Sequence, residues 1–412
     1  MADNIGLVPA TAEPHINKSH ITWFALCITL LGVSSTDIYI SSLPQMVRDF
    51  ATSPGMINLT ISSYTLAMAI GGLLMGILSN RFGRRKTLLS GIILYIISSF
   101  LIAHTASIAA MIILRIVQGA ACAAIAVITR LIFKDIMNPQ EQVHATGMLV
   151  MGLVISPALA PSIGALLAKY YGWQSCFELS SSLGIILFIA GLFIVKETNS
   201  TPINKLASPL TYLSAYFALL KDRTSLLLLT IIGFSFATYF VFIGISSYLY
   251  IDKLGISPLH YSYIFIVIAI GYFAGNSLMM YLNKHQLSHT KIIHRGLAIS
   301  LIGAGVILLG AIVTPVWLIV TLLTAGILIM RAGSALIISP AQVRLIEHAG
   351  AQSALAVGLA QFVQFTLSSL AVSLVVLFHS IPLAGLLIMT AMAFAPVLIA
   401  IIRQSKNHSF NN

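Results

Sequence analysis

An acidic residue, Asp37, lies within an apolar stretch near the start of the chain, in the sequence TDIYISSLPQM. An ionised carboxylate is costly in hydrocarbon, so we expect this side chain to face a protein or water-filled interior and to mark a functional site. The alternative is that the apolar stretch ends early and that Asp37 lies at an interface. The residues that follow, Ile38, Tyr39 and Ile40, continue the apolar stretch and favour the buried position.

A basic residue, Arg115, lies within a later apolar stretch, in LRIVQGAACAA. At 1.5 Å per helical residue, Asp37 and Arg115 both fall about 10 Å below the outer surface, so they could pair directly or through water. A nearby Arg stabilises an ionised carboxylate, whereas burial stabilises the protonated form, and a carboxylate held between these effects can exchange protons as access changes. The alternative is a static ion pair.

Charged residues within apolar stretches are notable because the chain as a whole carries few charges. The chain has 412 residues, of which 58% are hydrophobic and 8% are charged, whereas a soluble protein has roughly a quarter charged residues. Lipid must therefore surround most of the chain. The net charge of +11 is spread through short loops, so it indicates membrane topology and not a nucleic-acid partner.

Apolar stretches long enough to span a membrane, about 20 residues each, occur in two sets of six. The first set covers 21–43, 55–79, 87–104, 108–131, 142–168 and 175–195. The second set covers 224–250, 259–282, 292–312, 315–338, 353–378 and 381–402. We therefore divide the chain into a cytoplasmic tail at 1–20, a first half at 21–197, a linker at 198–223, a second half at 224–402 and a cytoplasmic tail at 403–412.

The distribution of Lys and Arg predicts the orientation. If both termini are cytoplasmic, most of these residues lie in inner segments, and Arg48, Lys169 and Lys253 lie in outer ones; positive residues are retained inside. The linker segment 209–223, PLTYLSAYFALLKDR, predicts either an amphipathic helix on the inner membrane surface or a plain linker. The two halves form a degenerate repeat, which suits parallel halves around a central cavity.

A basic loop separates the second and third predicted spans, with the sequence GILSNRFGRRK from Gly76 to Lys86. Its residues of interest are Gly76, Asn80, Arg81, Gly83, Arg84 and Arg85. The glycines permit close helix approach and a tight turn, because they carry no Cβ. On charge alone, the loop could serve only to set the topology.

This loop resembles the signature G-x-L-x-D-R-x-G-R-[RK]-[RK] of the major facilitator superfamily, which lies between the second and third spans. Asn80 stands where that family usually has Asp. The resemblance implies an all-α integral membrane fold of twelve transmembrane helices in two pseudo-symmetric six-helix bundles. It also implies a cytoplasmic charge relay that latches the outward-open state, and we expect Asn80 to weaken that latch because an amide carries no charge.

Other stretches resemble one branch of the superfamily, the Bcr/CflA-type proton-coupled drug exporters. LRIVQG matches the R-x-x-Q-G of their fourth span, in which the Arg is tied to proton transfer, and DIYISSLPQM resembles their first span. The fifth span contains SPALAPSIGALL, in which Pro157, Pro161 and Gly164 bend a helix and admit close neighbours. That pattern resembles the antiporter signature.

Candidate cavity residues combine aromatic, Met and amide side chains, which suit bulky amphiphiles. They are Thr36, Tyr39, Gln118, Met151, Tyr239, Phe242, Tyr263, Arg331, Gln361, Phe362 and Phe365. Arg331 lies deep in the tenth span with no acid in an obvious place, so backbone carbonyls or substrate could be its partner. Glu178 lies nearer a boundary of its span.

The leading hypothesis is a proton-coupled antiporter that exports amphipathic drug-like compounds by alternating access. An alternative is an exporter of one endogenous metabolite, such as a siderophore, with drug efflux incidental. An enzyme is disfavoured because no nucleophile–base pair, metal cluster or phosphate loop lies near Asp37 in the sequence. A channel fits less well, because two similar halves with proline-bent spans suit alternating access.

The expected partners follow from that hypothesis. They are a small-molecule substrate, protons and the lipid bilayer, without nucleic acid, cofactor or metal. We expect a monomer in the inner membrane of a bacterium, with both termini in the cytoplasm.

Overall fold

The computed structural model describes residues 17–199, 209–310 and 312–376, and all regular elements in these ranges are helical. Ten helices are long and apolar enough to cross a membrane. Together with α6 (Pro139–Tyr171), which has 33 residues, they follow the first eleven predicted spans. The predicted twelfth span, 381–402, the tail at 403–412 and most of the N-terminal tail lie outside the described residues.

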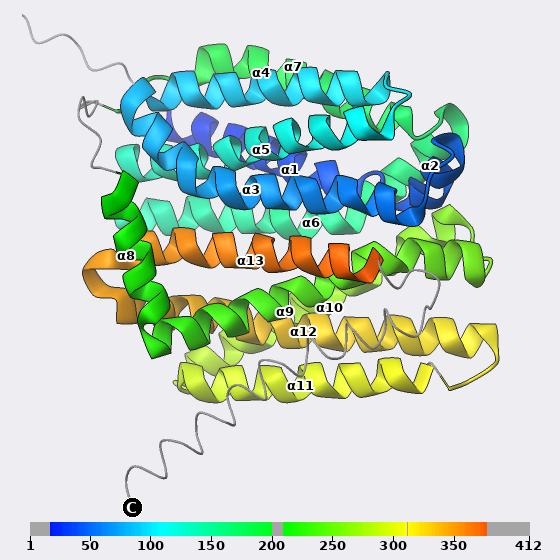
Figure 1. Cartoon of the computed structure of the whole chain (residues 1–412). Helices are drawn as coiled ribbons and strands as arrows, with labels where there is room; N and C mark the ends of the chain where they lie inside the picture. The colour runs from blue at the N-terminus through cyan, green and yellow to red at the C-terminus, as the bar shows by residue number, and fades with distance from the viewer. Residues whose placement is uncertain (1–16, 200–208, 311, 377–412) are drawn as a thin grey trace, which may run out of the picture.

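The helices form two bundles that lie side by side, with the first half of the chain above the second in Figure 1. The first bundle contains α1 (Lys18–Asp37), η1 (Ile40–Ser42), α2 (Leu43–Asp49), α3 (Pro54–Phe82), α4 (Arg84–Ala103), α5 (Ile108–Ile136), α6 and α7 (Gln174–Ile194). The second contains α9 (Arg223–Ser247), η2 (Tyr248–Lys253), α10 (Pro258–Lys284), α11 (His289–Gly310), α12 (Val316–Ala349), η3 (Gly350–Gln352) and α13 (Ser353–Val376).

Several helices begin at a polar cap followed by proline. Ser53 and Ser257 accept hydrogen bonds from backbone N–H groups of the first turns of α3 and α10, and Pro54 and Pro258 follow them. Proline suits the first helical position because its missing N–H group would have no partner there. The same start therefore opens the second long helix of each bundle, which agrees with an internal repeat.

The first predicted span is broken. The α-helix α1 ends at Asp37, the short helix η1 follows, and α2 begins with Pro44 in its first turn. A single helix over 21–43 was expected, but proline lacks the N–H group that would continue the hydrogen-bond ladder. Asp37 is nevertheless buried, with 4% of its surface exposed.

Helix α12 continues beyond its predicted end at residue 338. It passes through Pro340 and ends at Ala349, before Gly350, whose φ is +51°. A residue in this left-handed region is a usual end for a helix, and glycine adopts it without a Cβ clash.

Helix α8 (Pro209–Lys221) forms within the predicted linker. In Figure 1 it runs across one end of the molecule, beside α9 and α13. This is the end at which α3 meets α4 through Gly83, and we call it the loop end; the opposite end carries α2 and is called the α2 end. The position of α8 on a membrane surface stays a prediction.

The two bundles pack through α3 against α13 and through α6 against α10. Polar contacts between described residues cross from one bundle to the other toward the α2 end. They are Asn58 with the Gly244 carbonyl at 2.8 Å, Ser262 with Ser162 at 3.1 Å, Ser369 with the Ser62 carbonyl at 2.7 Å, Tyr248 with the Pro54 carbonyl at 3.5 Å, and Arg48 with Asp252 at 3.8 Å. The bundles are therefore closed against each other at the α2 end.

Candidate functional site

Asp37 lies at the last residue of α1, against α6. The hydroxyl of Ser156 donates a hydrogen bond to its Oδ2 at 3.1 Å. The two helices approach closely nearby, because a Cβ on Gly164 would overlap the carbonyl oxygen of Ile38. Gly164 thus allows α6 to lie directly against the break in α1.

Arg331 lies on α12 in the second bundle, between two aromatic rings. Its guanidinium carbon is 4.3 Å from the ring centroid of Tyr239 on α9 and 4.6 Å from that of Tyr272 on α10. Its Nε is buried and has no hydrogen-bond partner among the described residues. The partners of Arg331 in the described structure are therefore aromatic faces and not an acid.

Arg115 does not pair directly with Asp37, which corrects one of the sequence-based expectations. No ion pair joins the two side chains in the described structure. Instead, Nε of Arg115 donates to the carbonyl oxygen of Thr60 at 3.2 Å, and Nη1 donates to the carbonyl oxygen of Ser35 at 3.0 Å and to Gln118 at 2.6 Å. Arg115 is fully buried, so it belongs to the interior of the first bundle.

Arg115 reaches the backbone at the end of α1 and not the side chain of Asp37, whose hydrogen-bond partner is Ser156 on α6. Because α1 ends at Asp37, the carbonyl groups of its last turn have no partners within the helix. Arg115 satisfies one of them, and its guanidinium also lies 4.1 Å from the ring centroid of Tyr64 and 5.0 Å from that of Tyr39.

Three other predicted cavity residues are buried in the first bundle. Thr36 is 6% exposed, and Tyr39 is fully buried with its hydroxyl 3.0 Å from that of Thr60. Gln118 links Arg115 to the hydroxyl of Ser99, to which its amide donates at 2.7 Å. Tyr39 and Gln118 thus support Arg115. Met151 lies on α6, and its side chain is outside the described part of the structure.

The predicted cavity residues of the second half lie in different surroundings. Tyr239 contacts Arg331, whereas Phe242 packs against the rings of Tyr250 and Phe265 in the bundle core. Tyr263 is 46% exposed beside His260, so the structure does not bring it to Asp37. On α13, Gln361 lies beside Gly72 of the first bundle, Phe362 packs near α8 and α9, and Phe365 contacts Phe236.

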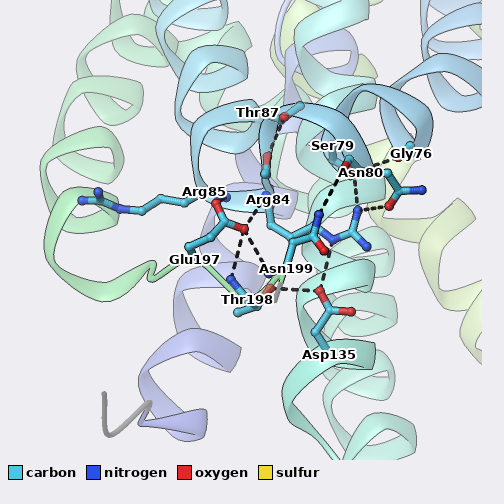
Figure 2. A network of polar contacts seen from close by, with 11 residues as sticks. Gly76, Ser79, Asn80, Arg84, Arg85, Thr87, Asp135, Glu197, Thr198 and Asn199 are labelled. Carbon is cyan, nitrogen blue, oxygen red and sulfur yellow. Dashed lines mark hydrogen bonds and ion pairs between the residues drawn. The ribbon is translucent and has the colours of Figure 1, made fainter. Parts of the chain in front are cut away.

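A second polar cluster lies at the loop end and is shown in Figure 2. Nε of Arg84 donates to Asp135 at 3.1 Å, and Nη1 donates to Ser79 at 2.6 Å and to Asn80 at 2.7 Å. The cluster joins the end of α3, the start of α4 and the end of α5. Asn80 therefore keeps a hydrogen bond to Arg84, while Asp135 supplies the negative charge.

The start of α4 is capped by Glu197, which follows α7. Its carboxylate accepts hydrogen bonds from the backbone N–H groups of Arg84 at 2.7 Å and Arg85 at 3.2 Å (Figure 2). An anion at a helix N-terminus is stabilised by the unpaired N–H groups and the helix dipole. Gly83 has a φ of +93°, and a Cβ there would clash with Glu197, so only glycine fits this turn.

The remaining basic residues of the loop differ in their surroundings. Arg85 donates to the carbonyl oxygens of Val195 at 2.8 Å and Leu192 at 2.9 Å, so it ties α4 to the end of α7. Arg81 is exposed and lies over the ring of Phe82. Gly76 lies where a Cβ would meet only Val127, at an ordinary 4.0 Å.

Sequence reasoning missed several partners of these residues. Ser156 and Tyr272 carry no signal in a single sequence, because serine and tyrosine are frequent in the predicted spans. Asp135 could have been identified from the sequence, since it ends the segment RLIFKD of the fourth span. Glu197 follows the sixth span and directly precedes two further members of the loop-end cluster, Thr198 and Asn199, which bind Asp135 and the Asn80 carbonyl.

The two bundles of membrane-length helices, with buried charged residues in their interiors, are typical of a multi-pass membrane transport protein. The model of the Major Facilitator Superfamily matches residues 22–373. The chain belongs to this superfamily. It is also similar to the solved D-xylose-proton symporter, with a TM-score of 0.69 and 16% identity, over 92% of this chain and 97% of that one. At this identity, the likeness shows the fold alone.

Curated relatives share less than a third of their residues with this chain. An "uncharacterized transporter" of Rickettsia bellii is 28% identical over 71% of this chain and 72% of its own length. The "bicyclomycin resistance protein homolog" of Haemophilus influenzae is 26% identical over 58% and 60%. The "chloramphenicol resistance protein" of Pseudomonas aeruginosa is 29% identical over 58% and 57%.

Proposed function

We propose that this chain is a secondary active transporter that exports amphipathic drug-like compounds in exchange for protons by alternating access. The observation that carries the proposal is Asp37, a carboxylate with 4% exposure at the break of a membrane helix. Ionisable residues at such depth are costly and mark ion or substrate pathways. The resistance names of two relatives support the substrate class.

The proposed cycle uses Asp37 as the proton carrier. When the α2 end opens, a proton from outside neutralises the carboxylate. The neutral acid is then carried through the closed state at lower cost, because burial penalises the charged form. When the loop end opens, Asp37 releases the proton to the cytoplasm and the site accepts substrate.

The proposal also includes the membrane, the orientation and the oligomeric state of the protein. The bulk of the protein lies in the inner membrane of a bacterium, with the loop end and both termini in the cytoplasm, and it acts as a monomer. A cysteine at position 81, which is exposed at the loop end, is then expected to react with a membrane-impermeant maleimide only from the cytoplasmic side. Reaction from outside intact cells would reverse the assigned orientation.

Transport in reconstituted vesicles tests the function. We expect a proton gradient to drive uptake of chloramphenicol or ethidium into inside-out vesicles by the wild-type protein, and purified protein to release protons on binding them. The Asp37→Asn variant is expected to lose gradient-driven transport while it stays folded in detergent. Wild-type gradient-driven transport by Asp37→Asn would move the coupling site elsewhere, with Glu178 the next carboxylate to test.

The natural substrate needs a separate experiment. If drug-like compounds are the substrates, we expect a deletion strain to secrete the same small molecules as the parent strain. Loss of one secreted metabolite, such as a siderophore, would instead favour the endogenous exporter.

A further inference from the structure

A small cavity lies inside the second bundle, between α9, α11 and α12 (Figure 1). All of its lining residues are buried, with at most 6% of each exposed. The cavity has room for about one water molecule. Its size and its hydroxyl groups together indicate a small polar ligand. Four lining residues carry a hydroxyl group and three are apolar: Ser235, Thr238, Ser300 and Ser334, with Leu297, Met330 and Ile337.

Ser300 on α11 contributes a polar group that the protein itself does not pair. The residue is 6% exposed, and its Oγ has no hydrogen-bond partner among the described residues. The hydroxyl lies against α12 at Gly333, where a Cβ would overlap it. A buried hydroxyl without a partner is costly, because it has lost its hydrogen bonds to water. Ser300 therefore needs a partner that fits into the cavity.

Two other hydroxyl groups of the cavity are available as acceptors. Thr238 on α9 donates its hydrogen to the carbonyl oxygen of Ser235 at 2.9 Å. Ser334 on α12 donates to the carbonyl oxygen of Met330 at 2.9 Å and lies 3.3 Å from that of Ser235. A hydroxyl oxygen that donates its hydrogen can still accept hydrogen bonds. The cavity thus offers one donor, from Ser300, and two acceptors.

The first bundle pairs its polar groups directly between the corresponding helices. There α1, α4 and α5 are the first, third and fourth long helices, as α9, α11 and α12 are in the second bundle. The hydroxyl of Tyr95 on α4 lies 2.6 Å from that of Ser35 on α1, and the amide of Gln118 on α5 donates to Ser99 on α4 at 2.7 Å. The second bundle has only short Ser and Thr side chains around its cavity, so a bridging molecule is needed to join them.

We propose that this cavity is a binding site for one water molecule, which accepts a hydrogen bond from Ser300 and donates to Thr238 and Ser334. A buried water typically makes about three hydrogen bonds to groups that would otherwise be unpaired. No acidic residue lines the cavity, so neutral water fits it better than a metal cation, which prefers charged oxygen ligands. The water joins α11 to α9 and α12 inside the second bundle, whatever compound the protein transports.

Radiolytic labelling of the full-length protein in detergent tests for the bound water. Irradiation with X-rays produces hydroxyl radicals from water, and radicals formed beside a methionine oxidise it to the sulfoxide. Met330 lines the cavity and is 1% exposed, so bulk solvent does not reach it. We expect Met330 to be oxidised, while Met111, which is fully buried and does not line the cavity, stays unmodified.

A double variant connects the labelling to the hydroxyl groups. Thr238→Val combined with Ser300→Ala leaves one of the three partners, fewer than the about two to four that a buried water needs. We expect this variant to lose the oxidation of Met330. The matched control is Ser368→Ala on α13, because Ser368 is fully buried but donates to the carbonyl oxygen of Gln364 in its own helix at 2.7 Å. The control is expected to leave the oxidation of Met330 unchanged.

Two results of the labelling would overturn the proposal. An unmodified Met330 in the wild type would mean that the hydroxyl of Ser300 turns to a carbonyl of its own helix and that the cavity is dry. Equal oxidation in the wild type and the double variant would mean that the radicals do not come from this site. An experimental map decides the matter if the double variant does not fold. We expect an ordered water about 2.7–3.2 Å from Oγ of Ser300, and its absence from a map that shows other buried waters would contradict the site.

Discussion

Arg84 and Asp135 form an ion pair, with Nε and Oδ2 separated by 3.1 Å, between the start of α4 and the end of α5. The side chain of Arg84 is 9% exposed and that of Asp135 is 20% exposed. The same guanidinium also binds Ser79 and Asn80 on α3. One cation therefore fixes the loop ends of three helices of the first bundle, and Asp135 carries the charge that Asn80 lacks.

Substitution Asp135→Asn is expected to destabilise the protein by about 1–3 kcal/mol, because it leaves a largely buried cation with neutral partners. Thermal unfolding in detergent measures the loss. Asp252→Asn is the matched control, since its pair with Arg48 spans 3.8 Å and is exposed, and exposed pairs contribute only about 0–1 kcal/mol. Equal losses in the two variants would contradict the role assigned to Asp135.

Substitution Asn80→Asp is expected to favour the conformation that is open at the α2 end. Helices α3 and α13 lie side by side, and α13 begins at Ser353 at the loop end. We expect closure of the loop end to bring residue 80 toward the positive N-terminus of α13, where a carboxylate would be stabilised.

The reactivity of a cysteine at the α2 end measures this shift. Gly244→Cys is suitable, because a Cβ at this position meets its neighbours at ordinary distances of 3.7 Å and more. We expect its maleimide reaction to be about two- to five-fold faster with Asn80→Asp, which corresponds to about 0.5–1 kcal/mol. Asn80→Gln, which adds no charge, is the control, and an unchanged or slower reaction with Asn80→Asp would count against a latch at this position.

Asp222 caps the start of α9 and is expected to make the stability of the protein depend on pH in the acid range. Its carboxylate accepts a hydrogen bond from the backbone N–H of Ser225 at 2.7 Å and lies 2.8 Å from the ring of His348. The Ser225 hydrogen bond, and to a lesser degree His348, lower the pKa of Asp222 below its usual value. A lowered folded-state pKa contributes stability that is present above the unfolded pKa and is lost as the pH falls through the folded pKa.

Asp222→Ala is therefore expected to cost about 1 kcal/mol at pH 7, as for other helix caps. The difference from the wild type is expected to shrink as the pH falls below about 4, the usual pKa of an unfolded Asp, and to be lost only below the lowered pKa of the folded carboxylate. Thermal unfolding at the two pH values checks both statements. Asp222→Asn, which keeps a capping oxygen without a charge, should retain most of the stability at both; a constant difference between the wild type and Asp222→Ala at all pH values would refute the linkage.

Sequence patterns predicted the helices well because lipid imposes a simple requirement on them. A membrane helix needs about 20 apolar residues and satisfies its own backbone, so eleven expected spans appear as long helices in the described residues. The break in α1 was not predicted, although Pro44 in the sequence could have indicated it. The pattern at Gly76 to Lys86 also placed the loop-end cluster correctly, since its position between two spans is encoded locally.

The partners of the buried charges could not be predicted in the same way. Counting residues gives the depth of Asp37 and Arg115 in the membrane, and depth alone allowed them to pair. The direction of each side chain depends on which helix packs on which side, and that is decided by contacts between distant parts of the chain. Arg331 illustrates this limit, because the two rings that enclose its guanidinium come from α9 and α10.

Arg115 is expected to act on structure and not on the titration of Asp37. It donates to the backbone of Ser35 in the last turn of α1 and to the backbone of Thr60 in α3, so Arg115→Gln leaves buried acceptors without donors, each at a cost of about 1–3 kcal/mol. We expect a lower thermal stability in detergent and impaired transport, because the end of α1 that carries Asp37 loses its anchor.

Substrate-induced proton release separates a structural role of Arg115 from a role in proton transfer. We expect Arg115→Gln that stays folded to release protons with the pH dependence of the wild type, since Arg115 donates to two carbonyl groups and to Gln118 and not to Asp37. Arg115→Lys serves as the control for charge, because it keeps a cation but loses the forked donor geometry that reaches two carbonyl groups at once. A changed pH dependence of proton release in Arg115→Gln, with Arg115→Lys unaffected, would restore Arg115 as the residue that tunes Asp37.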